Sequence, residues 1–406
     1  MKQPLAAESA AQAARAALPV AGRVGVAVLG ASGYVGAELV RLLAEHPGAS
    51  LRALAARQNA GQRFVEVWPG LPHVDFLLDH DEATDPAAWR ERGVEVVFAA
   101  LPHGAFAARA AAFLDAGLGV IDLSADFRLR AAADYRRRHH QAHPAAQLLA
   151  GAVYGLSEWC GPELAAARLV ANPGCYATAV LLAVLPAVAA GWWSGAPIVV
   201  NALSGVSGAG RTPSLATHFV ECGNSAAPYK VGEEHAHLAE MQQALGAVLA
   251  ASAAGVAAAA PSGGAARAPR AADGEAASDT PDHLAGCMVF NPHLVPMARG
   301  IVASVALPLG QERYTSEAQG LYERRYAPHP FVRVLAGAAL PETRHVRGSN
   351  RCDLAVRVVA GGRMLLVFAA IDNLVKGAAG QAIQNWNRMQ GWPETTGLPI
   401  GGWPCA

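Results

Sequence analysis

The stretch RVGVAVLGASGYVGAELVRLL, residues 23–43, decides the fold of the first part of this chain. Residues 23–29 form a short apolar run that ends before a glycine, as a buried strand does. Beyond the glycines, apolar side chains recur with the spacing of one helix face, at Val35, Leu39, Leu42 and Leu43. The stretch therefore predicts a strand, a tight turn and a helix in that order.

The turn carries three glycines at a three-residue spacing, Gly30, Gly33 and Gly36. Glycines let the backbone turn sharply and approach a pyrophosphate, and a helix N-terminus offers N–H groups and positive potential. An ordinary tight turn can share this spacing, but the position between a strand and a helix favours dinucleotide binding. The predicted cofactor-binding residues here are Gly30, Ser32, Gly33, Tyr34, Val35 and Gly36.

A second strand, predicted over residues 51–55, indicates which dinucleotide binds. An NAD-binding protein commonly carries an acid near the end of this strand, where it contacts the ribose 2′-hydroxyl. Residues 55–61 read AARQNAG and contain no acid, whereas Arg57 could face a 2′-phosphate. The sequence therefore favours NADP(H), with a plain surface role for Arg57 as the alternative.

Further strands at 94–100 and 119–123 enclose a predicted helix near 105–116. Strands that alternate with helices argue for a parallel sheet, and hence for an α/β fold. After a helix at about 176–190, the pattern changes to β-rich segments at 197–203, 287–292, 300–309, 352–359 and 364–370. These segments predict a mixed sheet in a second domain.

The last predicted helix covers residues 373–390, with Asp372 as N-cap and Gly391 as its stop. The region from about 250 to 282 stands apart, because Ala, Gly, Pro and Ser dominate it and it has no aromatic residue. Such a segment cannot bury enough apolar area to offset its ordering entropy. It is expected to be a disordered surface insertion, and residues 1–21 a disordered tail.

Composition narrows the class of protein. The chain has 406 residues, of which 52% are hydrophobic and 16% charged, with a formal net charge of zero. Nothing in this balance indicates a nucleic-acid or membrane partner, and the basic run 136–140 is interpreted as a solvated helix face. Six scattered cysteines without a CxxC pair argue against a metal site and suit a reducing cytoplasm.

The run NPGCYAT, residues 172–178, places Cys175 at the start of a predicted helix, directly after a Pro-Gly turn. Free peptide N–H groups and the helix dipole favour a thiolate there, and a thiolate is the nucleophile that forms thioesters. A buried structural thiol is the alternative.

The roles of several other polar residues are not yet decided at this point. Arg128 could hold an anion or pair with Asp122 or Asp126, and His103 follows a predicted strand where it could pack the loop or contact the cofactor. A Gly/Ser loop at 201–211 would allow a ligand to approach the backbone. His235 and His237 lie two residues apart, so they are no metal pair on a helix, but one could be a general acid/base.

Together these motifs resemble the N-acetyl-gamma-glutamyl-phosphate reductases over residues 22–398. The matching motifs, in order, are GASGYVGAEL at 30–39, LPHG at 101–104, DLSADFRL at 122–129, YGLSE at 154–158, NPGCYAT at 172–178, SGVSGAGR at 204–211, HAH at 235–237, NPHLVPMARGI at 291–301 and DNLVKGAAGQA at 372–382. The resemblance implies NADPH-dependent reduction of an acyl phosphate to an aldehyde, with release of phosphate.

It also implies a Rossmann-like NADP-binding domain at 22–173 plus 372–398. A second α+β domain at 174–371, with a mixed sheet, would supply catalysis and subunit contacts. The family forms homodimers or homotetramers, and we expect a cytoplasmic enzyme with a small-molecule substrate and no metal. An aspartate-semialdehyde dehydrogenase, or a carrier-protein-linked acyl-phosphate reductase of lysine biosynthesis, is the alternative.

The resemblance assigns roles residue by residue. Cys175 would be the nucleophile and His237 the acid/base; Ala236 stands where the family motif has arginine, so His235 stays a second candidate. Arg128, His235 and Arg211 would bind substrate. Ser207, Gly208 and Asn373 would lie near the nicotinamide.

Overall fold

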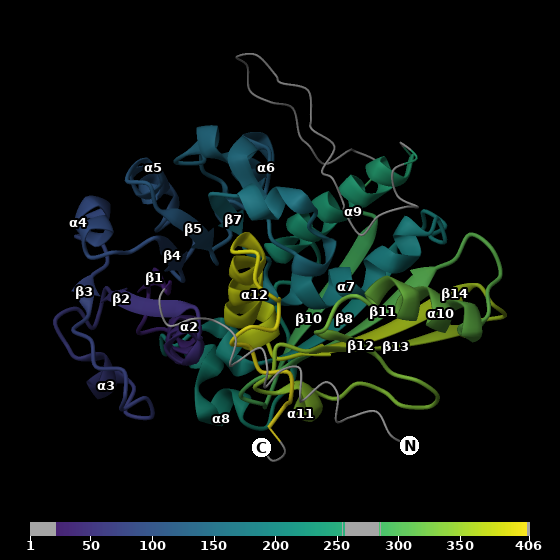
Figure 1. Ribbon diagram of the computed structural model, residues 1–406. Helices are drawn as coiled ribbons and strands as arrows, with labels where there is room; N and C mark the ends of the chain where they lie inside the picture. The colour runs from purple at the N-terminus through teal and green to yellow at the C-terminus, as the bar shows by residue number, and fades with distance from the viewer. Residues whose placement is uncertain (1–21, 254, 256–283, 285, 404–406) are drawn as a thin grey trace.

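The computed structural model describes residues 22–253, 255, 284 and 286–403 (Figure 1). The expected tail at 1–21 and most of the expected insertion at 250–282 lie outside these residues. Residues 250–253 belong to a helix, α9 (His237–Ala253), so the helix continues into the start of the segment that the sequence predicted to be disordered. The described residues form two sheets, each with its own covering helices.

The first sheet confirms the predicted parallel arrangement. Its strand order is β3-β2-β1-β4-β5-β7-β6, and every neighbouring pair is parallel. The strands are β1 (Val24–Leu29), β2 (Ala49–Ala56), β3 (Asp79–His80), β4 (Val96–Ala99), β5 (Gly119–Asp122), β6 (Ala152–Tyr154) and β7 (Leu169–Ala171). The helices of this half are α2 (Tyr34–Glu45), α3 (Phe64–Val67), α4 (Pro86–Glu91), α5 (Ala107–Asp115) and α6 (Ala132–His139). Ligands of such sheets bind beyond the carboxyl ends of the strands, where the predicted site residues lie.

The second sheet is mixed, also as predicted, with the order β12-β13-β14-β11-β8-β10-β9. β8 pairs in parallel with β10 and antiparallel with β11. The strands are β8 (Ile198–Gly205), β9 (Ala227–Pro228), β10 (Met288–Val295), β11 (Ile301–Pro308), β12 (Val332–Val334), β13 (Cys352–Val359) and β14 (Met364–Ile371).

One face of this sheet is covered by α7 (Cys175–Ala189), α9 and α10 (Thr315–Tyr326), as Figure 1 shows. Side chains alternate across β8 because successive residues of a strand point to opposite faces. Ile198, Val200 and Ala202 are buried under the helices, whereas Val199 and Leu203 are exposed. α7 is apolar on all sides and buried almost throughout, as a helix between a sheet and other helices must be.

The chain returns to the first half at its end. α12 (Gly380–Met389) places the buried Trp386 edge-on against Phe98 of β4, with ring centroids 5.8 Å apart. Figure 1 shows α12, in yellow, in the middle of the molecule beside α2. The helix predicted at 373–390 is interrupted, because residues Val375–Ala379 form a π-helix before α12 begins. Asp372 does cap this segment, since its Oδ1 accepts from the backbone N–H of Leu374 at 2.8 Å.

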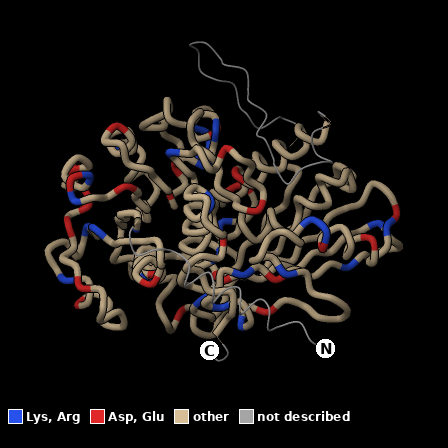
Figure 2. Tube along the Cα trace, viewed as in Figure 1, with Lys and Arg blue, Asp and Glu red and all other residues tan. Residues whose placement is uncertain are grey.

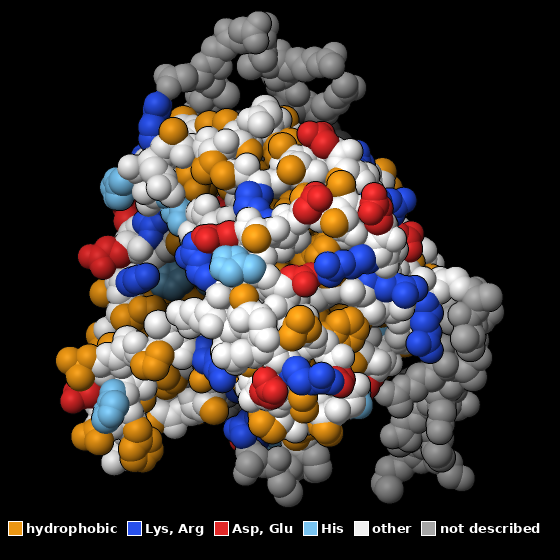
Figure 3. Space-filling view, turned by 90° about the vertical axis from the view of Figure 1, so that its left-hand side faces the viewer, with side chains coloured by type: hydrophobic (Ala, Val, Ile, Leu, Met, Phe, Trp, Pro, Cys, Tyr) orange, Lys and Arg blue, Asp and Glu red, His pale blue; other side chains and the backbone are white. Residues whose placement is uncertain are grey.

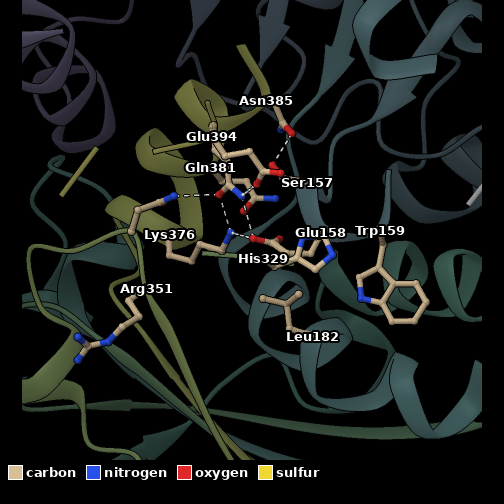
Figure 4. Close-up of polar contacts among 12 residues, drawn as sticks. Ser157, Glu158, Trp159, Leu182, His329, Arg351, Lys376, Gln381, Asn385 and Glu394 are labelled. Atoms are coloured by element: carbon tan, nitrogen blue, oxygen red, sulfur yellow. Dashed lines mark hydrogen bonds and ion pairs between the residues drawn. The ribbon is translucent and has the colours of Figure 1, made fainter. Parts of the chain in front are cut away.

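A buried ion pair anchors the π-helix (Figure 4). The Lys376 ammonium donates to Glu158 at 2.6 Å and to the side-chain oxygen of Gln384 at 2.7 Å, and neither charged side chain is exposed. The amide of Gln384 also donates to Glu158, at 2.9 Å. Buried charges require such partners because they have lost their hydration. The pair therefore fixes residues 375–379 on the turn that follows β6.

Charges of both signs alternate along the described residues (Figure 2). The space-filling view of the side that carries β3 and α4 shows basic, acidic and hydrophobic side chains interspersed (Figure 3). This distribution agrees with a formal net charge of zero. None of the helices within the described part of the chain combines the length and the hydrophobicity that crossing a membrane requires.

Removing one member of the buried pair should be far costlier than removing both. We expect Lys376→Met to lower the free energy of unfolding by about 3–5 kcal/mol, because the Glu158 carboxylate loses its counter-charge. Lys376→Met combined with Glu158→Met should recover most of this loss. Arg363→Met, which breaks the exposed ion pair with Glu312, is the matched control and should cost about 0–1 kcal/mol. Urea denaturation measures all three; equal losses for the buried and exposed pairs would contradict the account.

Candidate active site

The glycines of the motif after β1 meet two steric requirements. Gly30 has φ +77°, and a Cβ there would lie 2.3 Å from the carbonyl oxygen of Ala100. A Cβ on Gly36 would lie 2.1 Å from the carbonyl oxygen of Gly30. Gly33 is instead the N-cap of α2, and a Cβ there would make only an ordinary contact, 3.5 Å from the carbonyl oxygen of Gly30. The first N–H groups of α2, at Tyr34 and Val35, therefore begin at an uncrowded helix terminus suited to a phosphate.

Arg57 and Arg211 both lie near this loop. Arg57 directly follows β2 and forms an exposed ion pair with Glu82. Arg211 donates to the carbonyl oxygen of Ser32 at 2.8 Å, and its guanidinium stacks 4.3 Å from the ring centroid of Trp68. The structure thus places Arg211 at the glycine loop, and the substrate-binding role predicted for it stays a prediction.

Three residues predicted to lie near the nicotinamide come together from distant segments. The Asn373 amide donates to the Ser207 hydroxyl at 3.0 Å, and its oxygen accepts from the backbone N–H of Gly300 at 2.7 Å. A Cβ on Gly208 would lie 3.8 Å from the Asn373 amide nitrogen. The loop after β8 and the segment after β14 therefore form one wall of the site.

Cys175 is the first residue of α7 and is half-buried. Its Cβ lies 2.7 Å from where a Cβ on Gly377 would be, so the π-helix packs directly against the cysteine. Burial raises the pKa of the Cys175 thiol to about 11, although the charge of Arg128 and the N–H of Tyr176 lower it. The helix terminus therefore does not outweigh burial as the sequence argument supposed, and ionisation of the thiol at neutral pH requires a base.

His237 is the histidine nearest the turn that precedes Cys175. A Cβ on Gly174 would lie 2.3 Å from the His237 Nε2, so only glycine leaves room for the ring. Burial, followed by the charges of His235 and Arg128, holds the pKa of His237 well below its usual value. The imidazole is therefore neutral at pH 7 and can accept a proton.

His235 has a different environment. Its Nδ1 accepts from the backbone N–H of His237 at 3.2 Å, which caps the start of α9. Its ring packs against Tyr176, Tyr229 and Phe290, and burial lowers its pKa to about 4. These contacts give His235 a structural role as a cap, and the acid/base role predicted for His237 stays a prediction.

Glu240 is the central residue that the sequence argument missed. Its carboxylate accepts from Arg128 at 3.2 Å, from the Tyr154 hydroxyl at 2.9 Å and from the backbone N–H of Gly174 at 3.3 Å. It also lies 3.8 Å from the His237 Nε2. The three-residue spacing from His237 to Glu240 puts both on one helix face, a signal that the sequence did contain.

Arg128 joins this carboxylate to the cysteine turn. Its Nε donates to the carbonyl oxygen of Asn172 and its Nη2 to that of Leu123, both at 2.8 Å. Its ion-pair partner is Glu240, and not Asp122 or Asp126, the two acids that the sequence offered. A guanidinium has five N–H groups and these three bonds use one each, so the anion-binding role predicted for Arg128 stays a prediction.

His103 and the basic residues 136–140 also contact other segments of the chain. His103 Nδ1 lies 2.6 Å from Asp126 Oδ1, and its ring stacks on His139 at 3.8 Å. Arg138 donates to the carbonyl oxygens of Glu233 and Glu234, directly before His235. The run 136–140 is therefore more than a solvated face, because it ties α6 to the histidine segment. No His, Cys, Asp and Glu side chains within the described ranges gather as metal ligands would.

Two family models match this chain. The model "Semialdehyde dehydrogenase, NAD binding domain" matches residues 25–167. The model "Semialdehyde dehydrogenase, dimerisation domain" matches residues 175–258 and 278–373. The residues between the two matches, 168–174, contain β7 and the turn that leads to Cys175.

Relatives named N-acetyl-gamma-glutamyl-phosphate reductase match almost the whole chain. The protein of Symbiobacterium thermophilum is 42% identical over 379 residues, which are 93% of this chain and 97% of that protein. The protein of Pseudomonas aeruginosa strain PAO1 is 40% identical over 374 residues, 92% of this chain and 97% of that protein.

Solved structures with the same fold are more distant in sequence. Aspartate semialdehyde dehydrogenase II of Vibrio cholerae has a TM-score of 0.62 at 17% identity, over 91% of this chain and 99% of that one. The enzyme of Candida albicans, solved with NADP, has a TM-score of 0.58 at 16% identity, with the same shares covered. These likenesses concern the fold alone.

The raised pKa of Cys175 predicts how its reactivity depends on pH. Below a pKa of about 11 the thiolate fraction rises about tenfold per pH unit, so alkylation of Cys175 should keep accelerating from pH 7 to 10. Iodoacetamide labelling, read at the Cys175 peptide by mass spectrometry, measures this rate. A free cysteine peptide is the control, and its rate should level off above about pH 9. A plateau at Cys175 below pH 8 would contradict the assignment.

Proposed function

This chain belongs to the semialdehyde dehydrogenase family, among the N-acetyl-gamma-glutamyl-phosphate reductases, and we propose from this that it reduces N-acetyl-gamma-glutamyl phosphate with NADPH. The products are N-acetylglutamate 5-semialdehyde and phosphate. The observation that carries the proposal is the Cys175 thiol at a helix N-terminus, with a neutral His237 packed on the preceding glycine.

The cysteine begins the reaction. His237 takes the proton from Cys175 Sγ, and the thiolate forms a bond to the acyl carbon. The N–H groups at the start of α7 can hold the developing oxyanion. The bond between the acyl carbon and the phosphate oxygen then breaks, His237 gives its proton to the departing phosphate, and a thioester on Cys175 remains.

The cofactor fits the residues after β1 and β2. Residues 30–36 would hold the pyrophosphate, because Gly30 and Gly36 leave no room for a side chain and the N-terminus of α2 begins there. Arg57 would bind the 2′-phosphate. Ser207, Gly208 and Asn373 would lie beside the nicotinamide. NADPH supplies the hydride that reduces the thioester. The resulting hemithioacetal on Cys175 breaks at the carbon–sulfur bond to release the aldehyde, and the thiolate regains its proton from solvent through His237.

The alternative substrates, the acyl phosphate of a shorter acid or of an acid linked to a carrier protein, are not better supported than N-acetyl-gamma-glutamyl phosphate. The curated relatives that carry the acetylglutamyl name are 38–42% identical to this chain. The aspartate semialdehyde dehydrogenases share its fold at only 12–18% identity. The reaction chemistry is common to both groups, so we assign the substrate from the relatives with the higher sequence identity.

A dimer or tetramer of this chain would cover the open face of the second sheet. Val199, Leu203 and Val289 point away from the covering helices and are 36%, 40% and 42% exposed. Adjacent exposed apolar side chains on one sheet face are typical of an interface. The dimerisation-domain match over 175–258 and 278–373 includes both strands that carry them. The free thiols at Cys160, Cys175, Cys222, Cys287 and Cys352 suit a reducing cytoplasm.

The purified protein should reduce NADP when it is given N-acetylglutamate 5-semialdehyde and phosphate. Cys175→Ser should lose this activity by at least about a thousandfold, because the attacking thiolate is gone. Cys222→Ser, at another half-buried free thiol, is the control and should keep it. Activity with aspartate semialdehyde alone would overturn the substrate, and an unimpaired Cys175→Ser variant would overturn the thioester.

A charge in the open sheet face should break the oligomer. We expect Leu203→Glu to shift the protein towards monomer in light scattering after size-exclusion chromatography, because the carboxylate would lose its hydration in the interface. Leu77→Glu is the control, since Leu77 is 64% exposed and lies beside β3 of the first sheet. A wild-type monomer, or a Leu203→Glu protein of unchanged mass, would count against the interface.

A further inference from the structure

Lys230 is an exposed cation beside the histidines of the candidate active site, with a backbone φ of +45°. Side chains other than glycine rarely adopt this left-handed conformation, and it persists where the surrounding structure imposes it. Such positions gather at functional sites. The question is therefore what holds Lys230 in place and what its ammonium faces.

The chain is held on both sides of Lys230. Before it, β9 pairs with β10, and the backbone N–H of Tyr229 donates to the carbonyl oxygen of Pro292 at 3.1 Å. After it, Arg138 binds the carbonyl oxygens of Glu233 and Glu234. Lys230 is thus an exposed residue in a short connection whose two ends are fixed.

Its neighbour Tyr229 places this connection beside the nucleophile. The Tyr229 hydroxyl donates to the Tyr176 hydroxyl at 3.1 Å, and Tyr176 directly follows Cys175. The Tyr229 ring also packs against His235, with centroids 5.7 Å apart. The backbone of Lys230 therefore lies next to the candidate active site, and its side chain extends from that position.

Positive charges converge there. Burial lowers the pKa of His237 first, and the charges of Arg128, Arg138 and Lys230 then lower it further. Arg138 is engaged with two carbonyl groups and Arg128 with Glu240, whereas Lys230 is exposed. A convergence of cations at the mouth of a site is what a doubly anionic substrate would require.

We infer that Lys230 binds the carboxylate of the substrate, at the end opposite the reacting acyl phosphate. This inference rests on the proposed function, because N-acetylglutamyl phosphate carries one anion at each end. Arg128 bonds to the turn of Cys175 through Asn172 and so serves the phosphate end. Lys230 directly follows Tyr229, which packs against His235, and serves the carboxylate end. It is a specificity residue and takes no part in the proton transfers.

The test compares two aldehydes in the phosphate-dependent reduction of NADP, namely N-acetylglutamate 5-semialdehyde and 4-acetamidobutanal, which lacks the carboxylate. For the first aldehyde, Lys230→Met should raise KM about tenfold or more, as expected for loss of a charge-assisted hydrogen bond. Its kcat and its KM values for NADP and phosphate should change less than about twofold. For 4-acetamidobutanal, kcat/KM should be nearly the same in both proteins.

Lys230→Arg should restore part of the affinity, and Arg324→Met, at an exposed cation on α10, should behave as wild type. An unchanged KM in Lys230→Met would overturn the inference, and so would equal losses for both aldehydes, which indicate a structural role. A raised KM for phosphate would move Lys230 to the other anion and overturn it as well. A wild-type protein inactive on both aldehydes would instead reject the proposed function.

Discussion

The buried carboxylate of Glu240 is the contact on which the site depends. It receives hydrogen bonds from Arg128, Tyr154 and the backbone of Gly174, so it joins two segments of the first half and the cysteine turn to α9 of the second. A carboxylate with so little exposure needs all of these donors, because each replaces hydration that burial removed. Burial still raises its pKa above the usual value, with Arg128 as the main opposing influence. The geometry of the cysteine turn and of His237 is thus set by one desolvated group.

A second set of buried polar contacts holds the same turn from the other side. Asn172 receives a hydrogen bond from the Asn385 amide at 3.3 Å and donates to the carbonyl oxygen of Ala378 at 3.3 Å. The π-helix, which contains Ala378, brings Gly377 against Cys175. Single π-turns inside helices are frequent at functional sites, and here the π-turn places a backbone without Cβ against Cys175. The site is therefore clamped between α9 and the C-terminal segment.

Much of this architecture could be predicted from the sequence. Short apolar runs located the longer strands of both sheets, but not the short strands β3, β6, β7, β9 and β12. The sequence also located the helices α2, α5 and α7, and the glycine spacing located the nucleotide loop. The π-helix could not be predicted, because its pattern of side chains differs little from an α-helix. Glu240 was passed over because its role depends on Arg128, more than a hundred residues away. The thiolate at Cys175 was predicted from the helix terminus alone, since burial, which dominates its pKa, is a tertiary property. The hydrogen bonds from Arg138 to Glu233 and Glu234 also depend on tertiary structure, so they could not be predicted from the sequence either.

The return of α12 to the first sheet has a consequence for biosynthesis. Trp386 fills the core beside Phe98, yet it leaves the ribosome nearly three hundred residues later. Domains of many proteins fold in the order in which they are translated. Here the core of the nucleotide-binding half stays incomplete until the whole second sheet has been translated. Its completion coincides with the arrival of the segment that touches the cysteine, so a truncated chain would lack both a finished core and a finished site.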